Sequence, residues 1–457
     1  MSRILIDRCD VVATMDDRGT EIPGGSILVE GGTIAWVGRG TPPGAEGAAR
    51  IDGAGSVALP GLVNTHHHLY QALTRVRAQD RGLFEWLRAL YPLWAAVDAE
   101  WTHAAARVAL AELALSGCTA TVDHHYLFPR GTDSLALLGA EVEAAREVGL
   151  RFHPTRGSMD RGASRGGLPP DAIVEDPEAI LSETEAAVRR FHDPAPGAMV
   201  RLGVAPCSPF SASEGLMRAA ASLARRLGVR LHTHLAETRD EDAYCLATYG
   251  RRPLELLDDL GWLGPDVWLA HCVHLSEAHG DLERLARSGA AVAWCPTSNL
   301  RLGSGIAPAA ALRRAGVPLG LAVDGSASND SGHLLAEARL AMLVARRRGA
   351  AEMSARDALW IATRGGATCL GRQDIGALEP GRRADVALFP ADGLAFAGAE
   401  ADPVAALVHC APQRVRHLLV DGRPVVRRGR LVTADEDEIA ATGRRVARRI
   451  REWSEAR

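Results

Sequence analysis

The 457-residue sequence predicts an α/β fold, a (β/α)8 TIM-like barrel with a small β-sandwich domain formed by both termini. Three observations support this prediction. Short apolar segments alternate with alanine-, leucine- and arginine-rich helical stretches through the middle of the chain, which is typical of a closed parallel barrel. Glycine-punctuated, β-branched segments flank this repeat on both sides. Metal-ligating residues follow several of the apolar segments, at the barrel end where active sites lie.

The flanking segments are expected to be strands of one shared domain. Near the N-terminus these are residues 4–12 and 26–37, and near the C-terminus residues 384–389 and 417–426. Turn signals at residues 30–33 (Glu-Gly-Gly-Thr) and 421–422 (Asp-Gly) mark hairpins. The expected domains are residues 1–57 and 372–430 for the two parts of the β-sandwich, 58–371 for the metal-dependent barrel and 431–457 for a C-terminal helix.

Eight apolar segments are the expected barrel strands. They are residues 62–64, 120–123, 151–154, 201–205, 230–234, 267–271, 290–294 and 319–324. The stretches between them have helical composition, as at residues 141–147 and 215–227.

Composition is that of an ordinary globular protein, with 47% hydrophobic and 24% charged residues. The net charge of −4 gives no reason to expect a nucleic-acid partner. All 52 basic residues are arginine, because the sequence contains no lysine. The arginine run at residues 444–449 falls on a predicted amphipathic helix, residues 436–453, and is interpreted as a solvated helix face.

Cysteine usage and the N-terminus indicate the compartment. The eight cysteines form no Cys-x-x-Cys pair, which suits buried free thiols in a reducing environment. The N-terminus lacks the apolar core of a signal peptide, and no run approaches the roughly 20 apolar residues that span a bilayer. We therefore expect a cytoplasmic protein without a membrane partner; whether it forms a homo-oligomer is left open.

Three consecutive histidines follow the first barrel strand. Because side chains alternate along an extended chain, His66 and His68 share one face and His67 takes the other. Two imidazoles on one face can bind a single zinc through ring nitrogens. Taken alone this pair is weak evidence, since most histidine pairs are structural.

The same kind of residue follows three further strands. His234 and Glu237 come at the end of the fifth strand, His271 at the end of the sixth and Asp324 at the end of the eighth. Asp324 precedes a glycine and could be a turn residue, but four such sites in order favour one shared centre. His232 is expected to lie deeper in the barrel than His234. The remaining histidines near these strands are expected to be structural: His67, His124, His274 and His333.

These residues suit zinc hydrolysis. A catalytic zinc needs about three protein ligands and an open position for water, and His66, His68, His234 and Asp324 supply three nitrogens and a carboxylate for one zinc per chain. Glu237 can act as a proton shuttle without being a ligand. His271 can hydrogen-bond the same water, and Asp324 can take its proton.

The order of these motifs resembles the amidohydrolase superfamily over essentially the whole chain. Within it, the sequence is similar to the mononuclear deaminases of cyclic amidines, a group with guanine, cytosine and S-adenosylhomocysteine deaminases and triazine hydrolases. The resemblance implies zinc ligation by the four residues named above and catalysis by Glu237 and His271. Binuclear members commonly bridge two metals with a carboxylated lysine, which this chain does not contain.

Six stretches resemble deaminases of 8-oxoguanine in particular. They are residues 64–71, 90–94, 122–129, 155–159, 205–211 and 323–330. The resemblance implies zinc-dependent hydrolytic deamination of this oxopurine to urate and ammonia. The alternative is a deaminase or hydrolase of another aminated N-heterocycle: guanine, isocytosine or an s-triazine. A non-enzymatic scaffold is disfavoured because every ligand and both acid/base groups are present.

Expected substrate contacts are Gln71, Glu237, Arg156 and Cys207. The Gln71 amide can donate and accept at a lactam edge. Arg156 is equally compatible with a structural ion pair, and Cys207 with a buried structural thiol. Trp86 and Trp94 either stack on the ring or pack in the core. Iron or manganese in place of zinc is left open.

Overall fold

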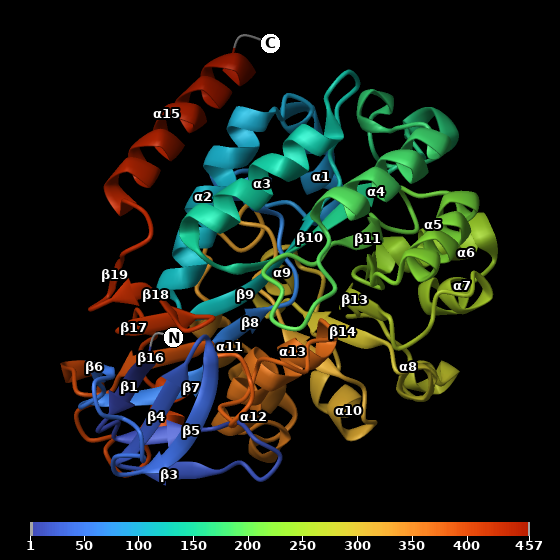
Figure 1. Ribbon diagram of the computed structural model, residues 1–457. Helices are drawn as coiled ribbons and strands as arrows, with labels where there is room; N and C mark the ends of the chain where they lie inside the picture. The colour runs from blue at the N-terminus through green and yellow to red at the C-terminus, as the bar shows by residue number, and fades with distance from the viewer. Residues whose placement is uncertain (1–2, 456–457) are drawn as a thin grey trace.

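In the computed structural model, which describes residues 3–455, eight parallel strands form one sheet at the centre of the molecule (Figure 1). The strands neighbour one another in chain order, as successive βα units require. They are β8 (Leu62–Asn64), β9 (Cys118–His125), β10 (Arg151–Ser158), β11 (Gly203–Pro206), β12 (Leu231–Leu235), β13 (Val267–His271), β14 (Ala291–Trp294) and β15 (Leu319–Leu321). The predicted barrel is confirmed.

The barrel closes where β15 meets β8. The Thr65 amide donates to the Leu321 carbonyl at 3.1 Å, and the Asp324 amide donates to the His66 carbonyl at 3.2 Å. Gly320 permits this close approach, because a Cβ there would lie 2.5 Å from the Thr65 side chain. The seam therefore brings two predicted metal ligands from opposite ends of the barrel sequence together.

Helices cover the outside of the barrel (Figure 1). They are α1 (Leu83–Trp94), α2 (Ala99–Leu115), α3 (Ser134–Val148), α4 (Pro177–Phe191), α5 (Glu214–Leu227), α6 (Arg239–Tyr249), α7 (Pro253–Asp259), α8 (Asp281–Ser288), α9 (Pro296–Arg301), α10 (Ala309–Arg314), α11 (Leu334–Ala345), α12 (Ala355–Trp360) and α13 (Gly366–Cys369), followed by α14 (Pro403–His409) and α15 (Glu436–Glu455). Their ends follow ordinary capping chemistry. Asp133, Ser213 and Thr238 accept N-terminal amides of α3, α5 and α6.

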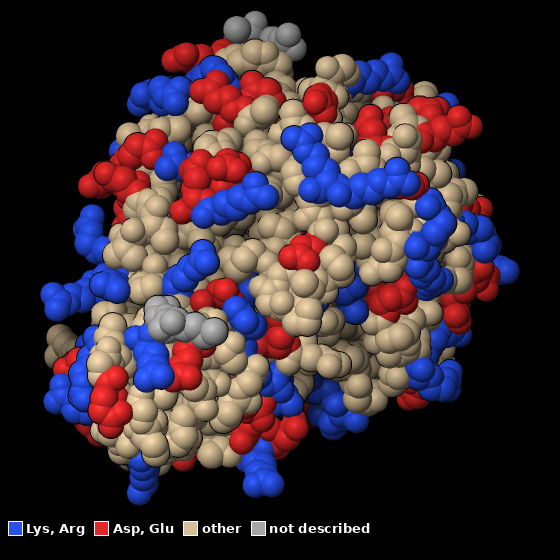
Figure 2. Space-filling view, viewed as in Figure 1, with Lys and Arg blue, Asp and Glu red and all other residues tan. Residues whose placement is uncertain are grey.

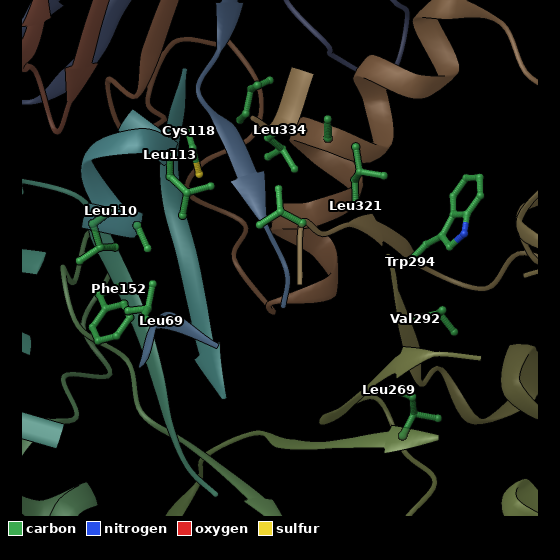
Figure 3. Close-up of a cluster of buried hydrophobic side chains, with 14 of the residues drawn as sticks. Leu69, Leu110, Leu113, Cys118, Phe152, Leu269, Val292, Trp294, Leu321 and Leu334 are labelled. Carbon is green, nitrogen blue, oxygen red and sulfur yellow. The ribbon is translucent and has the colours of Figure 1, made fainter. Parts of the chain in front are cut away.

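Apolar side chains fill the layer between strands and helices (Figure 3). Leu113 of α2 lies beside Cys118 of β9 in this layer. Inside the barrel the residues are mostly small, such as Ala120, Ala291 and Ala293, with Trp268 as the one aromatic side chain of that cluster among the described residues. The interior is therefore a packed floor beneath the mouth, as expected of a barrel of this size.

Two further sheets form the β-sandwich. One has the order β5-β4-β1-β6 and the other β19-β18-β17-β16-β7-β2-β3, so the second sheet joins strands from both chain ends (Figure 1). The strands are β1 (Arg3–Asp7), β2 (Val11–Ala13), β3 (Glu21–Pro23), β4 (Gly25–Glu30), β5 (Thr33–Arg39), β6 (Ala49–Asp52), β7 (Ser56–Pro60), β16 (Val386–Pro390), β17 (His417–Val420), β18 (Arg423–Arg427) and β19 (Arg430–Leu431). Buried Ile6, Ile27, Val386 and Leu388 belong to the cluster between them.

The expectation of a single strand over residues 4–12 is wrong. Arg8 adopts a left-handed backbone (φ 60°), and the chain passes there from β1 in one sheet to β2 in the other. The predicted strand over 319–324 is also too long, because β15 ends at Leu321 and Asp324 has φ 63°. Both hairpin turns are confirmed, since β4 ends at Glu30 and β5 begins at Thr33, and β17 and β18 flank residues 421–422.

Arginine and acidic side chains are interspersed on the face shown in Figure 2. In the predicted arginine-rich helix, α15, Arg445 and Arg449 pair with Glu100 of α2. No helix among the described residues is both long enough and apolar enough to cross a bilayer.

Candidate metal centre and active site

Four predicted ligands converge at the C-terminal end of the barrel. Nε2 of His68 lies 3.1 Å from Nε2 of His234 and 3.4 Å from Oδ1 of Asp324. Nε2 of His66 lies 3.3 Å from the same carboxylate oxygen. Donors at about 2.0–2.1 Å from a tetrahedral zinc stand roughly 3.3 Å from one another, so this spacing fits one such ion. We call these four residues the metal centre.

The outer nitrogens of these imidazoles fix where their protons lie. His68 Nδ1 faces the His124 carbonyl at 2.8 Å, and His234 Nδ1 faces the Cys207 carbonyl at 2.6 Å. A carbonyl only accepts, so Nδ1 carries the proton in both rings and each neutral ring has a bare lone pair on Nε2. These two lone pairs face each other at 3.1 Å. A bound cation removes that conflict.

His66 also carries its proton on Nδ1 and a bare lone pair on Nε2, because its Nδ1 hydrogen-bonds His232. Nδ1 of His232 donates to the Trp268 carbonyl at 2.8 Å, which leaves its Nε2 to accept from His66 Nδ1 at 2.7 Å. The Nε2 atom of His66 is buried and has no hydrogen-bond partner among the described residues. His232 also stacks on the Trp268 ring, with centroids 4.4 Å apart. It lies beneath the metal centre, where the sequence predicted it.

Burial and charge prepare these groups for a metal. Burial lowers the pKa of His234 to about 4 and the pKa of His66 well below its usual value, so both imidazoles are neutral. Burial alone would raise the pKa of Asp324, but the imidazoles of His66, His271 and His68 beside it outweigh burial and hold that pKa well below the usual range. Metal ligands must be deprotonated, and this set is.

Glu237 and His271 lie beside the metal centre. Nε2 of His271 is 3.5 Å from Oε2 of Glu237 and 3.9 Å from Oδ2 of Asp324. Burial, followed by the charge of Asp324, raises the pKa of Glu237 well above its usual value, whereas burial lowers the pKa of His271 to about 3. Glu237 therefore holds a proton readily near neutral pH, and His271 is neutral.

The backbone turns sharply at the strand ends that carry Glu237, His271 and Asp324. Ala236, His271 and Asp324 have φ values of 50°, 72° and 63°, in the left-handed region that non-glycine residues rarely adopt. The Glu241 carboxylate accepts the Ala236 and Glu237 amides at 2.9 and 2.8 Å and so holds the turn that carries Glu237. Strained backbone of this kind is characteristic of functional sites.

A cavity opens from the metal centre toward α1. Its apolar wall consists of Leu83, Trp86, Leu87 and Tyr91 of α1, together with Phe210 and Leu302. Its polar lining includes Gln71, Tyr126, Cys207, Glu237 and Ser328. The cavity thus combines an apolar slot with convergent polar groups, as small-molecule sites usually do.

Gln71 reaches the cavity from the 3-10 helix Leu69–Leu73. Its Nε2 donates to Tyr70 Oη at 3.3 Å, and its Oε1 accepts from the Ala327 amide at 3.3 Å. Gly325 leaves room for this orientation, because a Cβ at that position would lie 2.0 Å from Oε1 and displace the Gln71 amide. The amide is therefore held in place with one N–H left to donate.

Of the two remaining predicted substrate contacts, Cys207 lies at the cavity and Arg156 does not. Cys207 lines the cavity with a buried thiol whose pKa burial raises to about 12. Arg156 is not among the cavity residues; its guanidinium binds Glu175 at 2.6 Å and Glu183 at 2.8 Å and lies over the Phe128 ring. The ion pair is what the structure contains, and a direct substrate contact by Arg156 is not supported. Trp94 packs in the core, with its Nε1 bound to Thr74.

Several residues around the site escaped the sequence interpretation. Tyr126 and Asn299 follow β9 and β14, so the same strand-end rule could have found them. Tyr91 lies on α1, between two barrel strands, where the strand-end rule does not apply; Trp86 of the same helix, which was expected either to stack on the substrate ring or to pack in the core, lines the cavity. His124 belongs to the histidine cluster through its proximity, but its Nε2 donates to the Ala205 carbonyl at 2.9 Å.

Comparison with known proteins agrees with this geometry. The model of the amidohydrolase family matches residues 57–425. The chain belongs to the amidohydrolase family. The 8-oxoguanine deaminase of Pseudomonas aeruginosa is 46% identical over 414 residues, covering 90% of this chain and 91% of that protein. The hydroxydechloroatrazine ethylaminohydrolase of Pseudomonas sp. (strain ADP) is 38% identical over 458 residues, 96% of this chain and 94% of that protein.

A solved member of this family has the same architecture. The atrazine chlorohydrolase of Arthrobacter aurescens, crystallised with zinc, superposes with a TM-score of 0.92 at 35% identity and covers 97% of this chain and 100% of its own. The amidohydrolase resemblance and the barrel predicted from the sequence are both confirmed.

Proposed function

We propose that this amidohydrolase is a zinc-dependent aminohydrolase that converts 8-oxoguanine to urate and ammonia, with one zinc per chain. The observation that carries the proposal is the set of bare Nε2 lone pairs of His66, His68 and His234 converging on the Asp324 carboxylate. Glu237 and His271 complete the set of acid/base and hydrogen-bonding groups beside it. The likeness to the Pseudomonas aeruginosa 8-oxoguanine deaminase supports the choice of substrate.

A bound zinc would supply Lewis acidity and lower the pKa of a water to about 7. Asp324 is placed to accept a proton from that water, since its Oδ2 faces the cavity side of the site beside His271. The His271 Nε2 can donate a hydrogen bond as negative charge develops on the attacking oxygen. Stabilising such charge with fixed donors is usually the largest catalytic contribution.

Glu237 would move two protons in this reaction. The water oxygen forms a bond to C2 of the purine, and the adjacent ring nitrogen takes a proton from Glu237 as the ring loses aromaticity there. The second proton of the water, now on the oxygen at C2, passes through the Glu237 carboxylate to the exocyclic amine, and the proton held by Asp324 restores Glu237. The C2–N bond breaks, ammonia leaves and the oxygen remains as the new carbonyl. The raised pKa of Glu237 suits this double role near neutral pH.

Two unpaired donors in the cavity favour a substrate with carbonyl acceptors. Trp86 and Tyr91 line the cavity, and their Nε1 and Oη atoms are buried without a hydrogen-bond partner among the described residues. A buried donor without a partner costs about 1–3 kcal/mol, so both gain from a bound acceptor. 8-Oxoguanine carries carbonyl oxygens at C6 and C8. Gln71 would bind the lactam edge, and the Cys207 thiol lies in the same cavity.

The test is an assay of the purified protein, with its zinc content measured, on 8-oxoguanine, guanine, isocytosine and an amino-s-triazine. Ammonia release together with urate from 8-oxoguanine, at a kcat/KM at least about tenfold above that for guanine, supports the proposal. Comparable rates on guanine, or no reaction with either purine, would overturn the substrate assignment. Preferred hydrolysis of the triazine would instead favour the chemistry of the atrazine-hydrolase relatives, whose fold this chain shares.

A further inference from the structure

Asn299 carries a buried side-chain amide next to the catalytic groups. Neither the sequence motifs nor the metal centre explains its presence there. It lies on α9, which begins directly after β14, and its side chain is 1% exposed. Its main chain is fixed on both sides. The Asn299 amide donates to the Cys295 carbonyl at 3.0 Å, and its carbonyl accepts from the Ser304 amide at 2.8 Å. The Ser304 hydroxyl in turn donates to Glu237 Oε1 at 3.4 Å.

The side-chain amide of Asn299 contacts the inner nitrogen of His271. Nδ2 of Asn299 lies 3.0 Å from Nδ1 of His271. With the amide donating, Nδ1 is the acceptor, and the single proton of the neutral ring sits on Nε2. That nitrogen faces Oδ2 of Asp324, whose ionised carboxylate can only accept, at 3.9 Å, and lies 3.5 Å from Oε2 of Glu237.

The opposite orientation of the amide is unfavourable. If Asn299 Oδ1 accepted from His271 Nδ1, the lone pair of Nε2 would point at the ionised Asp324 carboxylate in a buried site. Lone pairs facing carboxylates repel, and the low dielectric of the interior strengthens that repulsion. The contacts on both sides of the imidazole therefore agree on one tautomer.

We propose that Asn299 is a positioning residue for the deamination, holding His271 as the tautomer with its proton on Nε2. Only this tautomer donates a hydrogen bond to the oxygen that attacks the heterocycle, where the other would present a lone pair to developing negative charge. Asn299 does not line the cavity itself and acts through His271. The role in turnover rests on the proposed function, whereas the tautomer does not.

The first test is spectroscopic and independent of turnover. Histidine labelled with ¹⁵N distinguishes a protonated ring nitrogen from a bare one, and His271→Gln identifies the His271 signal. We expect a protonated Nε2 and a bare Nδ1 in the wild type, in both metal-free and zinc-loaded protein. In Asn299→Asp the carboxylate can only accept, so Nδ1 should gain a proton. A wild-type His271 protonated on Nδ1 would overturn the proposal even if the enzyme were fully active on 8-oxoguanine.

The second test is kinetic. Asn299→Asp should keep one zinc per chain and a KM within about threefold, and lose about 10²–10⁴-fold in kcat, the range for imposing the wrong histidine tautomer. Asn299→Leu, of similar size but without a donor, should lose less and serves if the aspartate variant fails to fold. Leu300→Ala, on the exposed side of the same helix, is the control and should match the wild type.

A double-mutant cycle separates positioning from general support of the fold. If Asn299 acts through His271, then Asn299→Leu should cost less than about threefold in kcat when His271 is already glutamine. A full additional loss in that background would assign Asn299 a structural role and overturn the proposal. Absence of activity on every heterocycle would instead refute the proposed function and leave the spectroscopic result standing.

Discussion

Among its described residues the barrel contains two separate buried clusters of histidine and carboxylate side chains, and they differ in the groups that their ring nitrogens and carboxyl oxygens face. The first is the metal centre, His66, His68, His234 and Asp324. The second, here called the Asp123 triad, consists of Asp123, His125 and Glu141 on β9 and α3. Residue type and spacing alone would allow either cluster to hold a metal.

Hydrogen bonds separate the two clusters. In the triad, His125 Nε2 donates to the Leu127 carbonyl at 3.0 Å and Nδ1 contacts Glu141 Oε1 at 2.7 Å, so both ring nitrogens are engaged. In the metal centre, carbonyl oxygens and His232 occupy only the outer nitrogens, and every Nε2 faces the centre. The groups behind the ligands therefore decide which cluster offers lone pairs to an ion.

The pKa values of the carboxyl groups also distinguish the two clusters. Burial raises the pKa of Glu141 to about 8 and the pKa of Asp123 well above its usual value, so at neutral pH these carboxyl groups hold protons. The carboxylate of Asp324 is instead kept ionised beside neutral imidazoles. The triad is neutralised by protons, and the metal centre requires a cation. Asp123 also accepts the Leu69 amide at 2.5 Å, next to ligand His68, which gives the triad a structural role.

The largest expected effect comes from removing one histidine from each cluster. His234→Ala should lose both the zinc and detectable deaminase activity, because His68 and Asp324 then lose a donor of the same ion. The matched variant His125→Phe should keep one zinc per chain while its melting temperature falls. Elemental analysis and calorimetry measure both. Retention of zinc by His234→Ala, or its loss from folded His125→Phe, would reverse the comparison.

The second prediction separates acid/base catalysis from metal binding. Glu237→Gln keeps the size and burial of the side chain but cannot donate and regain a proton. We expect zinc to stay bound and kcat to fall by about 10²–10⁴-fold. Steady-state kinetics with parallel zinc analysis measures this effect. A near-normal rate in the zinc-loaded variant would contradict the role assigned to Glu237.

The third prediction concerns the cavity side of the metal centre. Gln71→Ala should lower kcat/KM for purines by roughly 10- to 100-fold, since it removes an oriented amide worth about 1.5–3 kcal/mol to the bound substrate. The zinc should remain, because the Gln71 side chain is bonded to Tyr70 Oη and the Ala327 amide and the substitution leaves the backbone bond from Gln71 to the His68 carbonyl in place. Kinetics on 8-oxoguanine with zinc analysis tests this, and unchanged kcat/KM would exclude Gln71 from substrate binding.

The smallest expected effect is a change in the pH dependence of stability. The folded-state pKa of Glu141 lies at about 8, above its ordinary value of 4.5. The stability that its proton contributes is therefore complete below about pH 4.5 and is lost as the pH rises through 8. Glu141→Gln, which stays neutral, should lack this loss. Between pH 5.5 and 9 its melting temperature should fall less than that of the wild type, by roughly 2–4 °C; parallel curves would contradict the protonated triad.

Local patterns predicted the barrel and the positions of the metal centre because parallel strands bring their C-terminal ends to one mouth. His66, His68, His234 and Asp324 could be found by this rule without knowing how the strands pair. The break at Arg8 could not, because both halves of residues 4–12 have the same β-branched texture and only the sheet arrangement separates them.

Local sequence patterns also could not predict contacts between elements that are distant in the chain. Arg156 pairs with Glu175, on the loop before α4, and with Glu183, on α4 itself. No sequence pattern near Arg156 predicts these two partners. The difference between the two clusters likewise depends on carbonyl groups, such as those of Cys207 and Leu127, which every residue carries. Sequence gives the ligand types, and only the fold gives the orientation of their lone pairs.

The most direct test of this account is anomalous X-ray diffraction at the zinc edge, on crystals of the protein purified with zinc. We expect one anomalous peak per chain, bounded by Nε2 of His66, His68 and His234 and by an oxygen of Asp324, with no peak between Asp123, His125 and Glu141. A peak at the Asp123 triad, two peaks at the barrel mouth, or no peak at the metal centre would contradict the account.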